Sequence, residues 1–243
     1  MRPSPRLLLL IFILLTSCQS KTDEQEIVVF AASSLTDSFN ELAATFEAKH
    51  PSSNIVLNFA SSSQLAAQIL EGAPADVFAS ANEQQIQLVE DAGLVEGSSH
   101  IFATNRLVLI TPQDNPADIH QILDLARSNT RFVTAVRGVP IREYTETLLA
   151  GFGEYDAIVE NIASEEPNVR LVVLKVALGE ADAAIVYATD VTTDVADQLR
   201  VIPLDAPTIP TYYIASLNDN VFTDFVLSEE GQAILQKWGF DAP

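Results

Sequence analysis

The sequence lacks the features on which several classes of protein depend. Its single cysteine, Cys18, leaves no intramolecular disulfide to support the fold. Its three histidines, His50, His100 and His120, are isolated, and no metal-ligand spacing joins them. It has no G-x-S-x-G turn, phosphate-binding loop or glycine-rich dinucleotide turn. We therefore expect neither an enzyme, nor a cofactor, nor a metal cation held directly by side chains.

Basic residues are also scarce, with 13 Lys and Arg against 33 Asp and Glu and a formal net charge of −20. Nucleic acid and anionic lipid headgroups are poor partners for such a surface. The acidic residues are scattered, which is typical of solvated faces. Because the overall field opposes an anion, any anion-binding site here must be local and built from oriented dipoles.

Long apolar runs are absent except for Leu7 to Leu15, which follows a basic start and ends at the small-residue segment Leu15-Thr16-Ser17-Cys18. This run is too short to span a hydrocarbon layer of about 30 Å, so residues 1–17 are predicted to be an export signal. The segment resembles a bacterial lipobox, which implies cleavage before Cys18 and lipid attached to it. The alternative is an ordinary signal with an incidental cysteine. Residues 18–26 are predicted to be a linker that tethers an exported domain.

After Ile27, short β-rich runs alternate with amphipathic helical patterns, which predicts α/β layers with mostly parallel sheets. At this length, two lobes and one long sheet are equally plausible. The predicted strands are 27–31, 54–59, 76–79, 106–111, 131–136, 183–186, 201–204 and 212–215. The predicted helices are 36–49, 64–70, 83–92, 116–127, 143–149, 155–161 and 169–178, with closing helices in 221–238.

Two serine clusters stand where predicted strands run into helices. Ser33-Ser34 follows the strand 27–31, and Ser61-Ser62-Ser63 follows the strand 54–59. Ligands bind beyond the carboxyl ends of strands in open α/β sheets, and helix starts offer unpaired N–H groups with a partial positive charge. The clusters therefore indicate an anion site. Serine is also a favoured N-cap, so the residues alone leave the simpler explanation, helix initiation, equally open.

Four blocks in the chain resemble one known family. They are Phe30 to Leu35 (FAASSL), Phe59 to Ser63 (FASSS), Gln68 to Phe78 (QILEGAPADVF) and Gly179 to Tyr187 (GEADAAIVY). Together they are similar to the periplasmic molybdate-binding proteins, the substrate-binding components of ABC importers. The resemblance runs from about Ile27 to the C-terminus and implies a type II periplasmic binding fold. It implies lobe I at 27–104 plus 208–243, lobe II at 105–207, and a ligand in the cleft between them.

The resemblance also implies the ligand-binding groups, all of them uncharged donors. Ser34 and Ser62 would offer hydroxyl and backbone N–H groups, Ile141 and Val169 backbone N–H groups, and Tyr187 its phenol O–H. Without the resemblance, Tyr187 would be interpreted as an aromatic residue with its ring in the core.

One segment departs from the family's pattern. The family usually has V-P-x-G-x-Y, whereas this chain has Val139 to Tyr144 (VPIREY) with Arg142 in place of the glycine. Ile141 is the positional match, although its backbone could be placed differently. Arg137 or Arg142 could add a cationic contact, but we expect both to face solvent.

The resemblance implies a monomer that binds molybdate or tungstate outside the cytoplasmic membrane and delivers it to a permease with its ATPase. Its contact with the membrane would be the lipid on Cys18 alone. Alternatives are another oxyanion such as phosphate or sulfate, ferric iron at Tyr212-Tyr213, and a sensor in place of an importer component. Alternation along a strand sends neighbouring tyrosine rings to opposite faces, which argues against iron. A hydrolase using Ser34 or Ser62 would need a general base, and none is visible.

Overall fold

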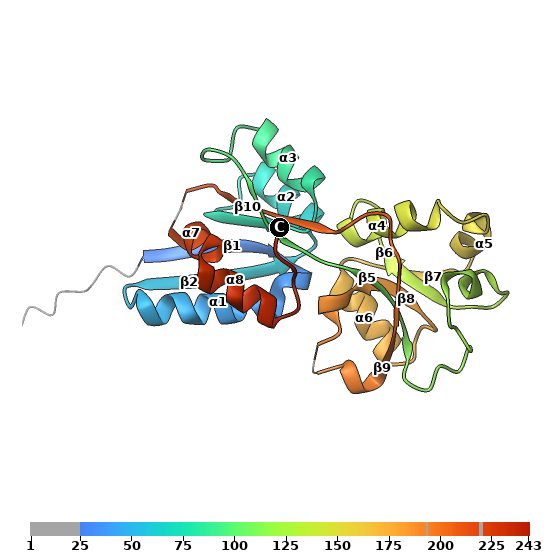
Figure 1. Ribbon diagram of the computed structural model, residues 1–243. Coiled ribbons are helices and arrows are strands. Elements are labelled where there is room, and N and C mark those ends of the chain that lie inside the picture. Colours follow the sequence, from blue (N-terminus) through green and yellow to red (C-terminus); the bar gives the residue numbers. More distant parts are fainter. Residues whose placement is uncertain (1–24, 193, 219–220) are drawn as a thin grey trace, which may run out of the picture.

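The computed structural model describes residues 25–192, 194–218 and 221–243, which form two α/β lobes (Figure 1). The predicted signal 1–17, the lipid-attachment residue Cys18 and most of the linker lie outside the described residues. The first strand begins at Gln25, inside the predicted linker, because Gln25 and Glu26 already pair in register with the next strand. Among the described residues, no helix has both the length and the apolar character needed to cross a membrane.

The first lobe is built on one five-stranded sheet. Its strands, in spatial order, are β2 (Ser53–Ala60), β1 (Gln25–Ala32), β3 (Val77–Ser80), β10 (Thr211–Ser216) and β4 (His100–Thr104). Strands β1, β2 and β3 are parallel, whereas β10 is antiparallel to both of its neighbours. The carboxyl ends of the three parallel strands therefore lie at one edge of the sheet, where the two serine clusters follow β1 and β2.

Helices cover both faces of this sheet. Alternate residues of β1 point to opposite faces, so Val29 packs in one apolar cluster and Phe30 in the other. On Val29's face lie helices α1 (Thr36–Lys49), α7 (Val221–Leu227) and α8 (Glu229–Lys237). On Phe30's face lie α2 (Ser62–Leu70) and α3 (Glu83–Asp91). Burial on both faces explains why β1 is predicted so readily from its apolar run.

The second lobe departs from the predicted, mostly parallel arrangement. Its larger sheet has the order β8 (Ala184–Tyr187), β5 (Leu107–Pro112), β9 (Leu199–Pro203), and β5 is antiparallel to both neighbours. Strand β6 (Phe132–Ala135) pairs in parallel with β7 (Ile162–Glu166), a strand that the sequence analysis does not predict. The correction has a simple cause: the chain enters this lobe on β5 and leaves it on β9, so these two strands run in opposite directions. The helices are α4 (Pro140–Leu149), α5 (Tyr155–Glu160) and α6 (Val169–Ala177).

The predicted helix 116–127 is wrong except for a 3-10 segment at Ile122–Ala126. Asn115 and Asp118 adopt left-handed φ angles of 43° and 53°, which end a helical path. The Asn115 side chain also accepts a hydrogen bond from the Ile119 N–H at 3.0 Å and donates to the Ile119 carbonyl at 2.9 Å. Local side-chain bonds to the backbone thus replace the helical ladder.

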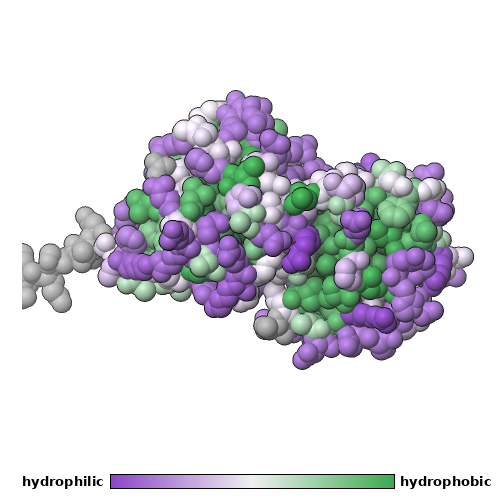
Figure 2. All heavy atoms as spheres, in the orientation of Figure 1, coloured by the Kyte–Doolittle hydropathy of each residue, from purple (hydrophilic) through white to green (hydrophobic). Residues whose placement is uncertain are grey.

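Two extended segments, from β4 into β5 and from β9 into β10, connect the lobes (Figure 1). In the space-filling view the lobes are two rounded masses that meet over a narrower region, and hydrophobic side chains gather on the second lobe (Figure 2). Buried apolar residues of both lobes, such as Leu35 and Val172, belong to one contiguous cluster. The lobes are therefore in contact, which corresponds to a closed arrangement. The boundaries at residues 104/105 and 207/208 stay a prediction.

Candidate anion-binding site

A small cavity between the lobes brings together every residue that the sequence predicts for the site. Ser34 and Ser62 line it from the first lobe, and Ile141, Val169 and Tyr187 line it from the second. The rest of its lining is Ala32, Ser33, Ser61, Ala81, Val139 and Pro140. The centre of a water molecule can occupy about 10 Å³ of this cavity, which is room for one small molecule or ion.

Helix starts converge on the cavity from both lobes. Ser34 lies in the 3-10 turn Ser33–Leu35 that leads into α1, and Ser62 is the first residue of α2. Val169 is the first residue of α6, and Ile141 is the second residue of α4. The first N–H groups of a helix have no carbonyl partner within it, and the aligned peptide dipoles place about half a positive charge there. The convergence therefore makes a local environment for an anion.

The capping residues leave these N–H groups available. The Ser61 hydroxyl accepts from the Gln64 N–H at 3.3 Å, and the Asn168 amide oxygen accepts from the Leu171 N–H at 3.1 Å. Both caps thus engage the third N–H of their helix and not the first. Helix α4 starts with Pro140, which has no N–H.

Gly138 sets the direction in which the chain enters α4. Its φ angle of +87° lies in the left-handed region, which a glycine adopts without strain. The chain turns there and presents the start of α4, with Ile141, to the cavity.

Each of the two serine hydroxyls already accepts a hydrogen bond from a protein donor. The Tyr212 phenol donates to Ser34 Oγ at 3.0 Å, and the Ala81 N–H donates to Ser62 Oγ at 3.0 Å. A serine hydroxyl has one proton to donate and two lone pairs. Each serine can therefore direct its own proton into the cavity, which favours a ligand that accepts hydrogen bonds.

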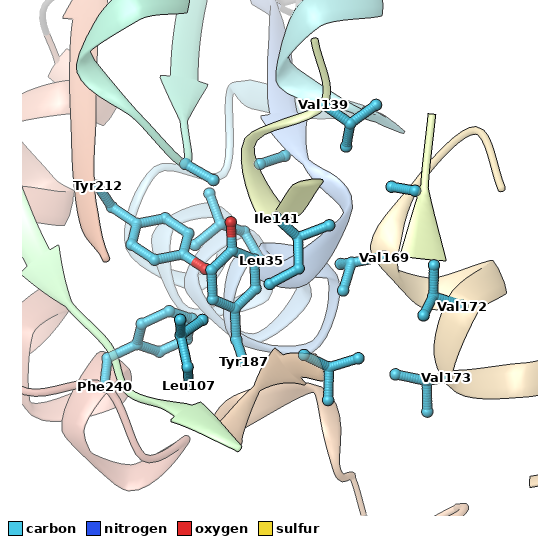
Figure 3. Close-up of a cluster of buried hydrophobic side chains, with 14 of the residues drawn as sticks. Leu35, Leu107, Val139, Ile141, Val169, Val172, Val173, Tyr187, Tyr212 and Phe240 are labelled. Atoms are coloured by element: carbon cyan, nitrogen blue, oxygen red, sulfur yellow. The ribbon is translucent and has the colours of Figure 1, made fainter. Parts of the chain in front are cut away.

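Tyr187 completes the cavity from the end of β8. Its side chain is 1% exposed, and its phenol oxygen has no hydrogen-bond partner among the described residues. Figure 3 shows its ring beside that of Tyr212, and the ring centroids are 5.7 Å apart. Burial holds the pKa of Tyr187 well above its usual value, so the phenol stays protonated. A buried, unpaired donor of this kind is rare in native proteins and indicates a ligand.

Arg142 does not enter the cavity, but it does not face solvent as predicted. Its side chain is 3% exposed and donates to the Ala135 carbonyl at 3.1 Å, to Glu146 Oε1 at 2.8 Å and to Glu165 Oε1 at 2.6 Å. The guanidinium thus ties α4 to β6 and β7, and it does not line the cavity. Arg137 is exposed as expected, with Glu146 as its nearest carboxylate at 3.8 Å.

The geometry gives little support to the rival sites. Tyr212 and Tyr213 pack in different apolar clusters on opposite faces of β10, as strand alternation predicts. The histidines His50, His100 and His120 are all exposed, and the Ser34 and Ser62 hydroxyls bond to a phenol and a backbone N–H in place of a general base. No group of three or more His, Cys, Asp or Glu among the described residues is arranged to hold a metal ion.

The sequence does not predict the residues that support the predicted donors, directly or through a neighbouring side chain. The sequence singles out Tyr212 only as half of the Tyr212-Tyr213 pair and offers no motif at Ala81 or Asn105, although the Asn105 amide donates to the Tyr212 phenol at 3.4 Å. Arg170 lies within the apolar helix pattern 169–178, and this pattern predicts no role for it in the site. Their only sequence signal is that each lies beside a predicted strand or helix end.

Residues 27–241 match the family of bacterial extracellular solute-binding proteins. Over 228 residues, the chain is 36% identical to the molybdate-binding protein ModA of Mycobacterium tuberculosis, and the match covers 90% of this chain and 85% of that one. The periplasmic molybdate-binding protein of Azotobacter vinelandii superimposes with a TM-score of 0.78 at 21% identity, covering 89% of this chain and 99% of that one.

The sulfate-binding protein SubI of Mycobacterium tuberculosis superimposes with a TM-score of 0.81 at 15% identity, covering 90% of this chain and 87% of that one. These structural neighbours confirm the two-lobed periplasmic binding fold. Since proteins named for two different anions share it, the fold alone does not select the anion.

Proposed function

Since the chain belongs to the family of bacterial extracellular solute-binding proteins, we propose that it binds one tetrahedral oxyanion, molybdate or tungstate, in the cavity between its lobes. One observation carries this proposal: donor groups from both lobes meet in a single buried cavity whose lining includes no charged side chain. The family is one of binding proteins and not of enzymes, in agreement with the sequence analysis. The name of the relative at 36% identity supports molybdate as the ligand.

The donors also suggest how the site selects its ligand. Ser34, Ser62 and Tyr187 each have a proton to give, and Ile141 and Val169 offer N–H groups. A protonated ligand would turn one of its oxygens into a donor that faces N–H and O–H donors, so a fully deprotonated dianion, which accepts from all of them, is favoured. Sulfate is a dianion of the same shape, and we attribute its rejection to its smaller radius and longer hydrogen bonds. Molybdate and tungstate are nearly the same size and should bind alike.

Ligand binding should favour the closed arrangement, because the anion joins donors of both lobes. We propose that the closed form then delivers its anion to a membrane permease with an associated ATPase. A lipid on Cys18 would hold the protein near that permease, although one acyl chain alone anchors only marginally. A sensor would use the same site, and a neighbouring permease gene would favour the importer.

Isothermal titration tests the proposal directly. Both apolar clusters lie in residues 27–240, so a chain without residues 1–18 keeps the described fold. After partial unfolding to remove bound anion, we expect tight one-to-one binding of molybdate and tungstate and no heat with sulfate. Equal affinity for sulfate would refute the size argument. No heat with any of the three would refute the assignment and direct the search to phosphate and ferric iron.

The serine cluster offers a matched pair of variants for the same titration. Ser62 lines the cavity, whereas its neighbour Ser63 does not and contacts the Ser61 hydroxyl at 3.2 Å. We expect Ser62→Ala to weaken molybdate binding by about 10-fold or more, which corresponds to one lost hydrogen bond to a charged ligand. Ser63→Ala should bind as the unchanged chain does. Equal effects of the two variants would argue against this cavity as the binding site.

A further inference from the structure

Arg170 reaches across the cleft beside the cavity. It is the second residue of α6, next to Val169, and therefore belongs to the second lobe. Its guanidinium donates to the Ser33 carbonyl at 3.2 Å and to Asp37 Oδ2 at 2.5 Å, both in the first lobe. One side chain thus connects the turn that carries Ser34 with the helix start that carries Val169.

Arg170 lies against a carboxyl group of each lobe. Within its own lobe, its Nε lies 3.3 Å from Asp190 Oδ1, and the Asp190 side chain is 0% exposed. Across the cleft it meets Asp37, so two carboxylates flank one guanidinium. Arg170 is not among the residues that line the cavity. These contacts assign it to a connection between the lobes and not to a direct contact with the anion.

We propose that Arg170 is a positioning residue that holds the lobes closed around the bound anion and aligns the Ser34 and Val169 donors. This inference rests on the proposed oxyanion-binding function. The contact with Asp190 lies within one lobe and persists when the lobes separate, whereas the contacts with Ser33 and Asp37 form only on closure. The pair therefore stabilises the closed state relative to the open one.

The structure indicates how large the effect is. The side chains of Arg170 and Asp37 are 25% and 28% exposed, so solvent screens the pair in part. A second contact across the cleft, from the Asn82 amide to Glu143 Oε2 at 2.7 Å, remains when Arg170 is replaced. The loss of closure is therefore partial. The apparent affinity scales with the fraction of closed molecules. A smaller closed fraction should therefore weaken binding, mainly through a faster dissociation rate.

The test compares Arg170→Gln, Asp37→Asn and the double variant by stopped-flow molybdate binding. We expect each single variant to raise Kd by about 5- to 30-fold, mainly through a larger koff. The double variant should bind no more weakly than the worse single one. The control is Arg131→Gln, which breaks an Arg–Asp pair (Arg131 Nη2 to Asp182 Oδ1, 2.6 Å) that does not cross the cleft. Unchanged koff in Arg170→Gln, or additive effects of the two substitutions, would overturn the proposal.

A second readout separates failure of this inference from failure of the proposed function. Cysteines placed at the exposed positions Ser98 and Ser128, one in each lobe, carry dyes that report the distance between the lobes. With and without molybdate, Arg170→Gln should show a smaller closed fraction than the unchanged chain, and Arg131→Gln should match the unchanged chain. If no oxyanion binds, the proposed function fails. The distances between the lobes in the ligand-free chains then still show whether Arg170→Gln opens the cleft relative to the unchanged chain. If anion binds and closure is the same in all three chains, Arg170 does not hold the lobes.

Discussion

Replacing Tyr187 by phenylalanine removes one oxygen atom from the cavity and should affect ligand affinity and ligand-free stability in different ways. The phenol oxygen is buried and lacks a hydrogen-bond partner among the described residues. In the ligand-free chain, its removal therefore breaks no bond and relieves the desolvation of an unpaired hydroxyl. We expect the free energy of unfolding to stay unchanged or to rise by about 1 kcal/mol.

The bound state should respond in the opposite direction. A hydrogen bond from a neutral donor to a charged ligand contributes about 1.5–3 kcal/mol, so Tyr187→Phe should raise the Kd for molybdate by about 10- to 150-fold. Urea unfolding of the ligand-free chain and calorimetric titration measure the two quantities on the same sample. Tyr213→Phe is the control, because the Tyr213 side chain lies on the face of β10 opposite to Tyr212 and does not line the cavity.

Two results would refute this reasoning about Tyr187. An unchanged Kd would mean that the phenol does not contact the anion. A loss of ligand-free stability as large as the loss of affinity would mean that Tyr187 serves the packing of the core. The second outcome corresponds to the simpler interpretation of this aromatic residue from sequence.

Three further variants test the surroundings of the site. Arg142→Ala should lower the free energy of unfolding by about 1–3 kcal/mol, because the buried Ala135 carbonyl loses its donor while Glu146 and Glu165, 33% and 43% exposed, stay partly solvated, yet calorimetry should show less than about a threefold change in Kd. Tyr212→Phe removes the donor that orients Ser34 and should raise Kd by about 3- to 10-fold, from one neutral hydrogen bond; no change would mean that Ser34 needs no such support. Burial raises the pKa of Asp190 to about 7, above its unfolded value of about 3.9. The folded chain then holds this proton longer than the unfolded chain, so stability should fall as pH rises from about 4 to 7, by at most on the order of 4 kcal/mol. Urea unfolding at pH 5 and pH 8 should show this component in the unchanged chain and not in Asp190→Asn; equal pH slopes would contradict it.

Sequence predicted best those elements whose signal is local. Strand β1 is a continuous apolar run because both faces of its sheet are covered, and α1 has the predicted bounds Thr36–Lys49. The strand β7 was missed: its sequence IASEE has alternating half-buried and exposed positions and only modest β propensity. It is a strand because β6 offers a ladder for it, and such pairing between distant segments leaves no mark on a short window of sequence.

The same distinction holds at the site. Motif blocks predict Ser34, Ser62 and Tyr187, and positional match to the family predicts Ile141 and Val169; all five line one cavity. Whether they bind the anion stays a prediction until the titrations are done. The side chains behind them depend on tertiary contacts that no short motif encodes.

The burial of Arg142 also depends on tertiary contacts that the sequence does not show. As an arginine on a polar helix face it is expected in solvent, but its guanidinium is buried and meets the half-exposed Glu165 of strand β7 at 2.6 Å. Its burial follows from the position of β7, which was itself not predicted. An error in one long-range pairing thus propagates to the side chains that the pairing brings together.

Under the proposed function, this acidic chain must attract a dianion through local electrostatics. The net charge of −20 is spread over the surface, where salt screens it beyond about 8 Å. Four helix starts point at the cavity, and at about half a unit of charge each they supply on the order of two positive charges, which matches a dianion. Arg170, which follows the lining residue Val169, lies between Asp37 and Asp190 and is not among the residues that line the cavity. A free guanidinium would attract anions of any shape and protonation state. Under the proposed function, donors fixed by the backbone bind best a ligand whose lone pairs fall where the protons point, so selectivity rests on the size, shape and protonation state of the ligand.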